Sequence, residues 1–197
     1  MKVGIIGFGS IGLEVAKALI IGIEEFTLIG IVSRSKENAK KRIANLKHPI
    51  IIYDLDTLIE KCDVLIDCAP KEAFKEIAEK CIDNKKTLIT VSGAGILDNL
   101  DLEKLAKKNK TQIILATGAI LGLDALRAAS ESIINSVKMI TRKPPNALSN
   151  APYIIENKIN LENLSTPKLI FQGTATEGAK AFPANVNVAA AVGLAGI

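Results

Sequence analysis

The sequence predicts an α/β protein in which a doubly wound parallel sheet is followed by an incomplete, smaller α+β domain. Short runs of branched apolar residues recur through the first 117 residues, and segments with helical spacing separate several of them. Unbroken apolar runs of this length are typical of parallel strands that are buried on both faces. The rhythm changes after Gly118, so we expect one domain at 1–117 and a second at 118–197.

Six runs of strand length lie in the expected first domain, at residues 3–6, 28–32, 50–53, 64–67, 87–91 and 113–116. Two apolar stripes with helical spacing fall between them, one made of Ile11, Val15, Ala18 and Leu19 and the other of Ala73, Ile77, Ala78 and Cys81. A further helix is expected from Asp101, whose carboxylate is suited to cap it. Strands that alternate with helices in this way predict a parallel sheet.

A different order of elements is expected beyond Gly118. Residues 124–136 have the pattern of a helix, and residues 137–141 and 168–174 have the pattern of strands. The prolines between 143 and 152 oppose regular structure, residues 177–181 suit a helical turn, and an Ala-rich helix is expected from 184 onward. Two or three strands are few for an independent core, so we expect that the chain belongs to a longer reading frame.

The composition argues against several classes of protein. With 48% hydrophobic and 23% charged residues, the chain can bury enough apolar surface to fold. A formal net charge of +4, scattered basic residues and the lack of tryptophan argue against nucleic acid as a partner. The three cysteines form no Cys-x-x-Cys pair, so we expect neither a disulfide framework nor a metal site.

Neither apolar end of the chain suggests export or a membrane. The run at 3–6 is interrupted at once by Gly7, which is unlike a secretory signal. The stretch at 186–197 is too short to cross about 30 Å of hydrocarbon. We therefore expect a cytoplasmic protein that does not bind a membrane.

A glycine-rich motif, Gly7-Phe8-Gly9-Ser10-Ile11-Gly12, directly follows the first expected strand and opens the first expected helix. In a Rossmann-type fold the first glycine of such a motif allows a tight turn, the second lets the backbone approach a pyrophosphate, and the third allows close helix–strand packing. The helix N-terminus offers N–H groups to the phosphates. The motif therefore predicts a site for NAD or NADP, and the alternative is a glycine turn with a structural role only.

The end of the second expected strand bears on the choice between these two cofactors. A site selective for NAD places an acid there, but this chain has Ser33 and Arg34, followed by Ser35. Arg34 and the serines could hold a 2′-phosphate, so we expect NADP to be accepted. The alternative is a solvated arginine at the start of a helix.

Two further loops follow expected strands, at the edge of a parallel sheet where ligands bind. One contains Ala69 and Pro70, and the other contains Ser92 and Gly93. Their small residues would let a nicotinamide riboside lie against the backbone, although each loop could also be an ordinary connection. The one histidine, His48, lies before an expected strand, at the opposite edge, so we expect it to have no chemical role.

Two segments of the sequence are more specific than the features that all dinucleotide-binding proteins share. Residues 118–126, GAILGLDAL, and residues 182–191, FPANVNVAAA, resemble signatures of the L-aspartate dehydrogenase family, and 141–143 and 171–178 are similar to intervening parts of it. The resemblance implies NAD(P)-dependent oxidation of L-aspartate to iminoaspartate, which hydrolyses to oxaloacetate and ammonia. It also implies a role in NAD biosynthesis through quinolinate, and a homodimer.

The same resemblance implies further site residues. Ala119 would touch the nicotinamide, and Asn185 and Asn187 would lie at the junction of cofactor and substrate, unless these asparagines merely cap a helix. Arg142 and Lys143 are candidate partners of the substrate carboxylates, although a solvated strand end would look the same.

The chain departs from the family pattern in two respects. Leu121 replaces the first glycine of a Gly-Gly pair, and the family's catalytic histidine belongs to an N-x-H-E segment expected beyond Ile197. We therefore expect no catalytic residue within this chain, and little turnover from these residues alone. Alternative interpretations are another two-domain amino-acid or homoserine dehydrogenase, and a dinucleotide-binding module without catalysis.

Overall fold

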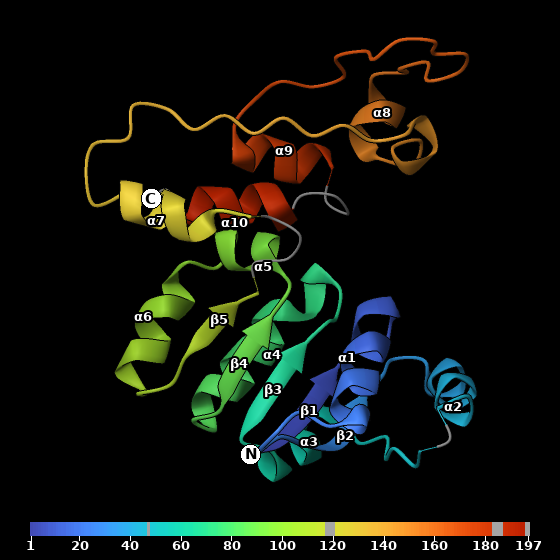
Figure 1. Ribbon diagram of the computed structural model, residues 1–197, viewed down its shortest axis with the longest axis vertical. Coiled ribbons are helices and arrows are strands. Elements are labelled where there is room, and N and C mark those ends of the chain that lie inside the picture. Colours follow the sequence, from blue (N-terminus) through green and yellow to red (C-terminus); the bar gives the residue numbers. More distant parts are fainter. Residues whose placement is uncertain (47, 117–120, 183–186, 196–197) are drawn as a thin grey trace. The chain divides into compact units, whose positions relative to one another are not determined.

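The structure is a computed structural model, and it describes residues 1–46, 48–116, 121–182 and 187–195 (Figure 1). The chain separates into two units, Met1–Ala116 and Thr117–Ile197.

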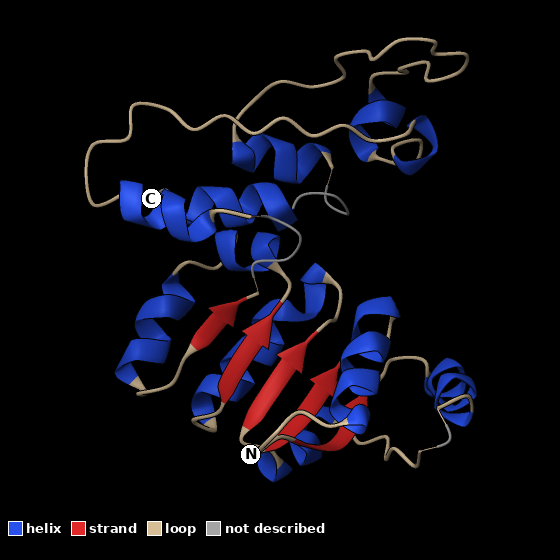
Figure 2. Ribbon diagram, in the orientation of Figure 1, coloured by secondary structure: helices blue, strands red, loops and turns tan. Residues whose placement is uncertain are grey.

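A parallel sheet of five strands forms the centre of the first unit (Figure 2, red). The strands are β1 (Lys2–Ile6), β2 (Thr27–Val32), β3 (Val64–Asp67), β4 (Thr87–Thr90) and β5 (Ile113–Leu115). Their spatial order is β2-β1-β3-β4-β5, and every neighbouring pair is parallel. The predicted parallel sheet is therefore confirmed.

The prediction of a strand at 50–53 is wrong in detail. This segment forms one isolated parallel bridge between Ile52 and Ile31 of β2. The Ile31 N–H donates to the Ile51 carbonyl, and the Tyr53 N–H donates to the Ile31 carbonyl, both at 2.9 Å. The pairing is short because Pro49 precedes it and Asp54 already caps the next helix. With this segment counted, the order becomes the 3-2-1-4-5-6 arrangement of Rossmann folds, and the direction of winding reverses between β1 and β3.

Helices cover both faces of the sheet in the first unit (Figure 1). They are α1 (Ser10–Ile21), α2 (Lys36–Ala44), α3 (Leu55–Lys61), α4 (Phe74–Asp83), α5 (Gly93–Leu97) and α6 (Asp101–Lys108), with a short 3-10 turn at Lys71–Ala73. One buried cluster packs α1 and α2 against Ile5 and Ile31, and a second packs α3, α4 and α6 against Leu65 and Leu88. Two cores on opposite faces confirm that the sheet is doubly wound.

Two details of the expected helices differ from the prediction. Ile11 is 53% exposed, and the buried face of α1 is formed by Gly12, Ala16 and Leu19 instead. Asp101 is the first residue of α6, and the capping position belongs to Leu100, with no side-chain cap. Asp101 therefore acts on the helix through its charge in the first turn, where a carboxylate favours the helix dipole.

The described part of the second unit contains helices and coil. The helices are α7 (Leu123–Ala129), α8 (Pro152–Glu156), α9 (Ala175–Ala181) and α10 (Asn187–Ala195), with a 3-10 turn at Pro145–Ala147. The strands predicted at 137–141 and 168–174 are not formed, and no strand is found among the residues described in this unit. A strand needs a neighbour to satisfy its backbone N–H and C=O groups, and neither segment is paired with one.

The helix predicted at 124–136 ends earlier, at Ala129. Ser130 stands at its C-cap, where the Ser130 hydroxyl donates to the Arg127 carbonyl at 2.6 Å. A serine that bonds to the preceding turn competes with continuation of the helix. The turn expected at 177–181 is part of α9, which begins with a complete capping box between Thr174 and Glu177.

Candidate functional site

The candidate site lies at the carboxyl edge of the sheet in the first unit, where the loops after parallel strands meet. The loop after β1 contains the glycine motif, and the loop after β2 contains Ser33 and Arg34. The loops after β3 and β4 contain Ala69 with Pro70 and Ser92 with Gly93. The sheet order therefore brings together all the cofactor-binding residues predicted in this unit.

The three glycines occupy different surroundings. Gly7 has φ +92°, and a Cβ there would lie 2.6 Å from the Ala69 nitrogen, so the turn accepts only glycine. At Gly12 a Cβ would lie 2.1 Å from the Gly7 carbonyl oxygen, which explains how closely α1 approaches the turn. At Gly9 a Cβ would point into open space.

The backbone at Gly9 is open and begins a helix. Gly9 is the N-cap of α1, and no side chain caps this end of the 12-residue helix. An uncapped helix N-terminus presents N–H donors and the positive end of the helix dipole to an anion. Ser10 and Ile11 are exposed beside Gly9, so a ligand can reach this backbone.

One residue of the motif differs from expectation. The Phe8 side chain is only 5% exposed and belongs to the core beneath α1 and α2, so it cannot contact a ligand. Any contribution of Phe8 to a cofactor site is limited to its backbone. Its carbonyl already accepts a hydrogen bond from Arg42 Nη1 at 3.2 Å.

Arg42 is a residue that sequence reasoning missed. It lies in the last turn of α2, and its partly buried guanidinium ties that helix to the glycine turn. Arg42 and Phe8, whose carbonyl accepts this hydrogen bond, are 34 positions apart in the chain, and no local sequence pattern predicts the contact.

The end of β2 presents a basic and hydroxylic surface. Arg34 is exposed and makes no hydrogen bond or ion pair within the described part of the chain. Ser33 is half-buried, and its hydroxyl donates to the Ser35 carbonyl at 3.1 Å, while the Ser35 side chain caps α2 by accepting from the Asn38 N–H. The nearest carboxylate along the chain is Glu37, in the first turn of α2.

A buried carboxylate links the loops after β3 and β4. Asp67 accepts from the Ala69 N–H at 2.9 Å and from the Thr90 hydroxyl at 2.7 Å, and Thr90 Oγ1 accepts from the Ser92 N–H at 2.9 Å. Burial raises the pKa of Asp67, and the hydrogen bonds from Thr90 and Ala69 oppose that rise. Asp67 and Thr90 were not predicted as site residues, although the buried acid at the end of a strand was a usable signal.

The remaining predicted site residues are not in the first unit. Ala119 and Asn185 lie outside the described residues. Asn187 is the exposed first residue of α10, and Arg142 and Lys143 lie in exposed coil of the second unit.

Neither Cys68 nor His48, the cysteine beside the glycine turn and the one histidine of the chain, is poised for chemistry at pH 7 in the described part of the first unit. Burial, and to a smaller extent the charge of Asp67, raises the pKa of the Cys68 thiol to about 11. His48 is exposed between α2 and the bridged segment, with Nδ1 3.0 Å from the Pro49 carbonyl oxygen. The searched part of the chain holds no cluster of three metal-ligating side chains, and none of its helices is long and apolar enough to cross a membrane.

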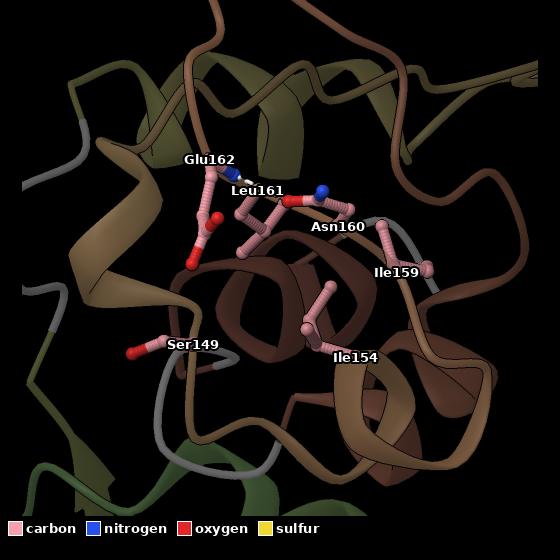
Figure 3. Close-up of a pocket in the computed structure, with 6 residues that line it drawn as sticks. All are labelled: Ser149, Ile154, Ile159, Asn160, Leu161 and Glu162. Atoms are coloured by element: carbon pink, nitrogen blue, oxygen red, sulfur yellow. Dashed lines mark hydrogen bonds between the residues drawn. The ribbon is translucent and has the colours of Figure 1, made fainter.

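A hollow of about 370 Å³ lies in the second unit (Figure 3). Its lining combines apolar side chains such as Ile154 with Asn160 and Glu162, and the Glu162 N–H donates to Asn160 Oδ1 at 2.7 Å. None of its lining residues is a predicted site residue, so this hollow is not the candidate site.

Both units match models of known families. Residues 7–116 match the model described as "Homoserine dehydrogenase, NAD binding domain", and residues 124–197 match "Aspartate dehydrogenase, C-terminal". The first unit is thus an NAD(P)-binding domain of the Rossmann type, in agreement with its sheet order and glycine turn.

Named relatives match the whole chain. An L-aspartate dehydrogenase of Bradyrhizobium diazoefficiens is 43% identical, and the alignment covers 100% of this chain and 70% of that protein. L-aspartate dehydrogenase 3 of Bordetella bronchiseptica is 36% identical, with 100% and 73% covered. The crystal structure of aspartate dehydrogenase from Thermotoga maritima superimposes with a TM-score of 0.76 and 25% identity, covering 100% of this chain and 74% of that one. The chain therefore belongs to the L-aspartate dehydrogenase family of oxidoreductases.

Proposed function

We propose that the protein catalyses the NAD- or NADP-dependent oxidation of L-aspartate to iminoaspartate, which hydrolyses to oxaloacetate and ammonia. The observation that carries this proposal is the 43% identity over all 197 residues to a protein named L-aspartate dehydrogenase. The open, uncapped helix N-terminus at Gly9 supports the part that concerns the cofactor.

We propose that the first unit binds the cofactor. Gly9 and the first N–H groups of α1 bind the pyrophosphate, and the backbone at Ala69–Pro70 and Ser92–Gly93 lies against the nicotinamide half. The bound nicotinamide supplies the acceptor for the hydride that leaves the substrate Cα. The protein's own task is to orient the substrate and to exclude water.

Aspartate carries two carboxylates, and both need cationic or N–H partners. We propose Arg142 and Lys143 for this role, with Asn187, Asn185 and Ala119 near the junction of cofactor and substrate. His48 is proposed to take no part in proton transfer, because it is exposed and lies before the bridged segment, away from the carboxyl ends of the strands.

We further propose that Arg34 allows the protein to use NADP. An exposed, unpaired guanidinium at the end of β2 suits a 2′-phosphate. Replacing Arg34 by alanine should lower the ratio of kcat/KM for NADP to that for NAD about tenfold, the loss of one charge-assisted phosphate contact. Lys40→Ala, on the exposed side of α2, is the charge-matched control. An unchanged ratio in Arg34→Ala would contradict the proposed role of Arg34 in NADP use.

The resemblance also supports a place for the product in NAD biosynthesis, through quinolinate, and a cytoplasmic homodimer. The buried free thiols of Cys62 and Cys81 agree with a reducing compartment. Light scattering on the purified protein measures the oligomeric state directly.

Turnover with defined substrates tests the proposed reaction. The protein is incubated with NAD or NADP and L-aspartate, D-aspartate, L-alanine or L-homoserine, and both the reduced cofactor and the oxo acid are quantified. L-Aspartate should be preferred, with oxaloacetate and ammonia formed in equal amounts. Homoserine is the second candidate, because the family model of the first unit carries that name. Cofactor binding without oxidation of any substrate would favour a non-catalytic module.

A further inference from the structure

The first unit buries very few polar side chains. Among the residues that the structure describes, the buried polar or charged ones are Asp67, Thr90 and Ser92, with exposed fractions of 1%, 0% and 3%. All three stand at or just beyond the carboxyl ends of β3 and β4. The rest of the described core is apolar, so this cluster is concentrated where the cofactor loops begin.

The cluster is a short chain of hydrogen bonds that fixes two turns. One oxygen of the Asp67 carboxylate accepts from the Ala69 N–H, which shapes the turn after β3. The other accepts the Thr90 hydroxyl proton, so Thr90 Oγ1 is left to accept from the Ser92 N–H after β4. The hydroxyl thus faces a fixed acceptor and a fixed donor, and its orientation is determined.

The turn after β3 also packs on the glycine turn. The Cys68 N–H donates to the Ile6 carbonyl at 2.7 Å, immediately before Gly7. A Cβ at Gly7 would lie 2.6 Å from the Ala69 nitrogen and from the Cys68 carbonyl group. A shift of the turn after Asp67 would therefore displace the loop that is proposed to hold the pyrophosphate.

Stability of the core alone does not account for an acid in this position. Asp67 forms no ion pair in the described part of the chain, and its burial opposes ionisation. A buried polar pair is often no more stabilising than well-packed apolar side chains of the same size. Its benefit here is geometric, because it specifies the backbone of two loops at once.

We propose that Asp67 and Thr90 are positioning residues that hold the loops after β3 and β4 in the shape that receives the nicotinamide half of the cofactor. This inference rests on the proposed function. Neither side chain needs to touch the cofactor, since both act through the backbone of Ala69 and Ser92.

Replacement of the Thr90 hydroxyl tests the proposal. Thr90→Val keeps the shape and removes the hydrogen bonds, Thr90→Ser keeps the hydroxyl, and Thr87→Val makes the same change at the other end of β4. Binding of NADH and of ADP-ribose, which lacks the nicotinamide, is measured by calorimetry for each folded variant. Thr90→Val should weaken NADH binding about tenfold and leave ADP-ribose within about twofold, whereas Thr90→Ser and Thr87→Val should resemble the wild type.

The outcomes separate the two proposals. Unchanged NADH affinity in Thr90→Val, or an equal loss for NADH and ADP-ribose, would overturn the positioning role. If Thr90→Val fails to fold, Asp67→Asn is judged by the same two ligands, because an amide has only one acceptor oxygen and cannot accept from both the Ala69 N–H and the Thr90 hydroxyl. A wild type that binds NADH but oxidises no aspartate would overturn the proposed reaction, and the comparison of variants would still decide the inference. A wild type that binds no NADH would overturn both.

Discussion

At the scale of single residues, the glycine motif shows how far spacing alone carries a prediction. The spacing correctly separates a turn glycine, Gly7, from a packing glycine, Gly12, and the surroundings of both agree with that assignment. The role of Gly9 is the one that involves a ligand, and it stays a prediction supported by the open space above it.

Gly9→Val should weaken NADH binding at least about tenfold, because the branched side chain would fill the space that the pyrophosphate needs. The thermal midpoint should change little, since no atom of the described residues, apart from Gly9 and its two neighbours in the chain, lies within 4 Å of the added Cβ. Gly12→Ala is the opposite control: its Cβ would lie 2.1 Å from a carbonyl oxygen, so it should lower the midpoint. Calorimetry and thermal melting of both variants check this contrast, and equal NADH affinity in a folded Gly9→Val would contradict it.

Asp67 should make the stability of the protein depend on pH in a defined direction. Burial raises its pKa above the ordinary carboxyl value of 3.8, so the folded state holds this proton more tightly than the unfolded chain. The resulting contribution to the free energy of unfolding is complete below that value, and it is lost as the pH rises through the higher pKa of the folded state.

Asp67→Asn has no carboxyl group at this position, so its stability does not contain this pH-dependent loss. The free energy of unfolding of the variant, relative to the wild type, should therefore increase as the pH rises from 4 toward 7. Carboxylates whose pKa is lowered, such as Glu103 and Glu177, give the opposite slope in both proteins and cancel in the difference. Urea unfolding at four or five pH values measures it, and a difference that does not vary with pH would show that Asp67 titrates normally.

At the scale of elements, the local sequence pattern correctly predicted the strands that pair with neighbours in the sheet. It wrongly predicted strands in segments that have the same kind of residues but no neighbouring strand. Runs at 3–6, 28–32 and 64–67 are strands because each lies beside another strand along most of its length. The run at 137–141 has similar residues but no strand beside it in the described part of its unit, and it is coil. Apolar, branched residues indicate that a segment can be a strand, and only a partner makes it one.

Arg42 is an element-scale contact, because its guanidinium joins α2 to the glycine turn through the Phe8 carbonyl. Arg42→Met keeps much of the apolar stem and removes the donor. The loss should lower the free energy of unfolding by about 1.5 kcal/mol, the lower end for a charged donor, because the site is only partly buried. Lys41→Met, the exposed neighbour in the same turn, should change it much less. Urea titrations that give equal values for both variants would contradict a structural role for this contact.

At the scale of the whole molecule, the structure brings the predicted nucleotide-site residues of the first unit to one edge of a sheet, whereas the predicted substrate residues lie in coil or at a helix end. The cofactor loops follow strands of one parallel sheet, so their order along the chain is enough to bring them to one edge. Asp67 with Thr90, and Arg42 with Phe8, depend on contacts across 23 and 34 positions that no local pattern encodes. The residues proposed for the substrate lie in the second unit, where the described chain has no sheet to fix their neighbours.

The first unit should therefore fold and bind the cofactor without the second. Both buried clusters of the sheet lie within residues 1–116, and so do the glycine turn and the loops after β2, β3 and β4. A protein of residues 1–116 should melt cooperatively and bind ADP-ribose, which lacks the nicotinamide that Ala119 is proposed to touch, within about threefold of the full chain. Circular dichroism and calorimetry test these two statements. A loss of ADP-ribose binding well beyond threefold in a folded 1–116 would mean that the second unit contributes directly to the affinity for the ADP-ribose half of the cofactor.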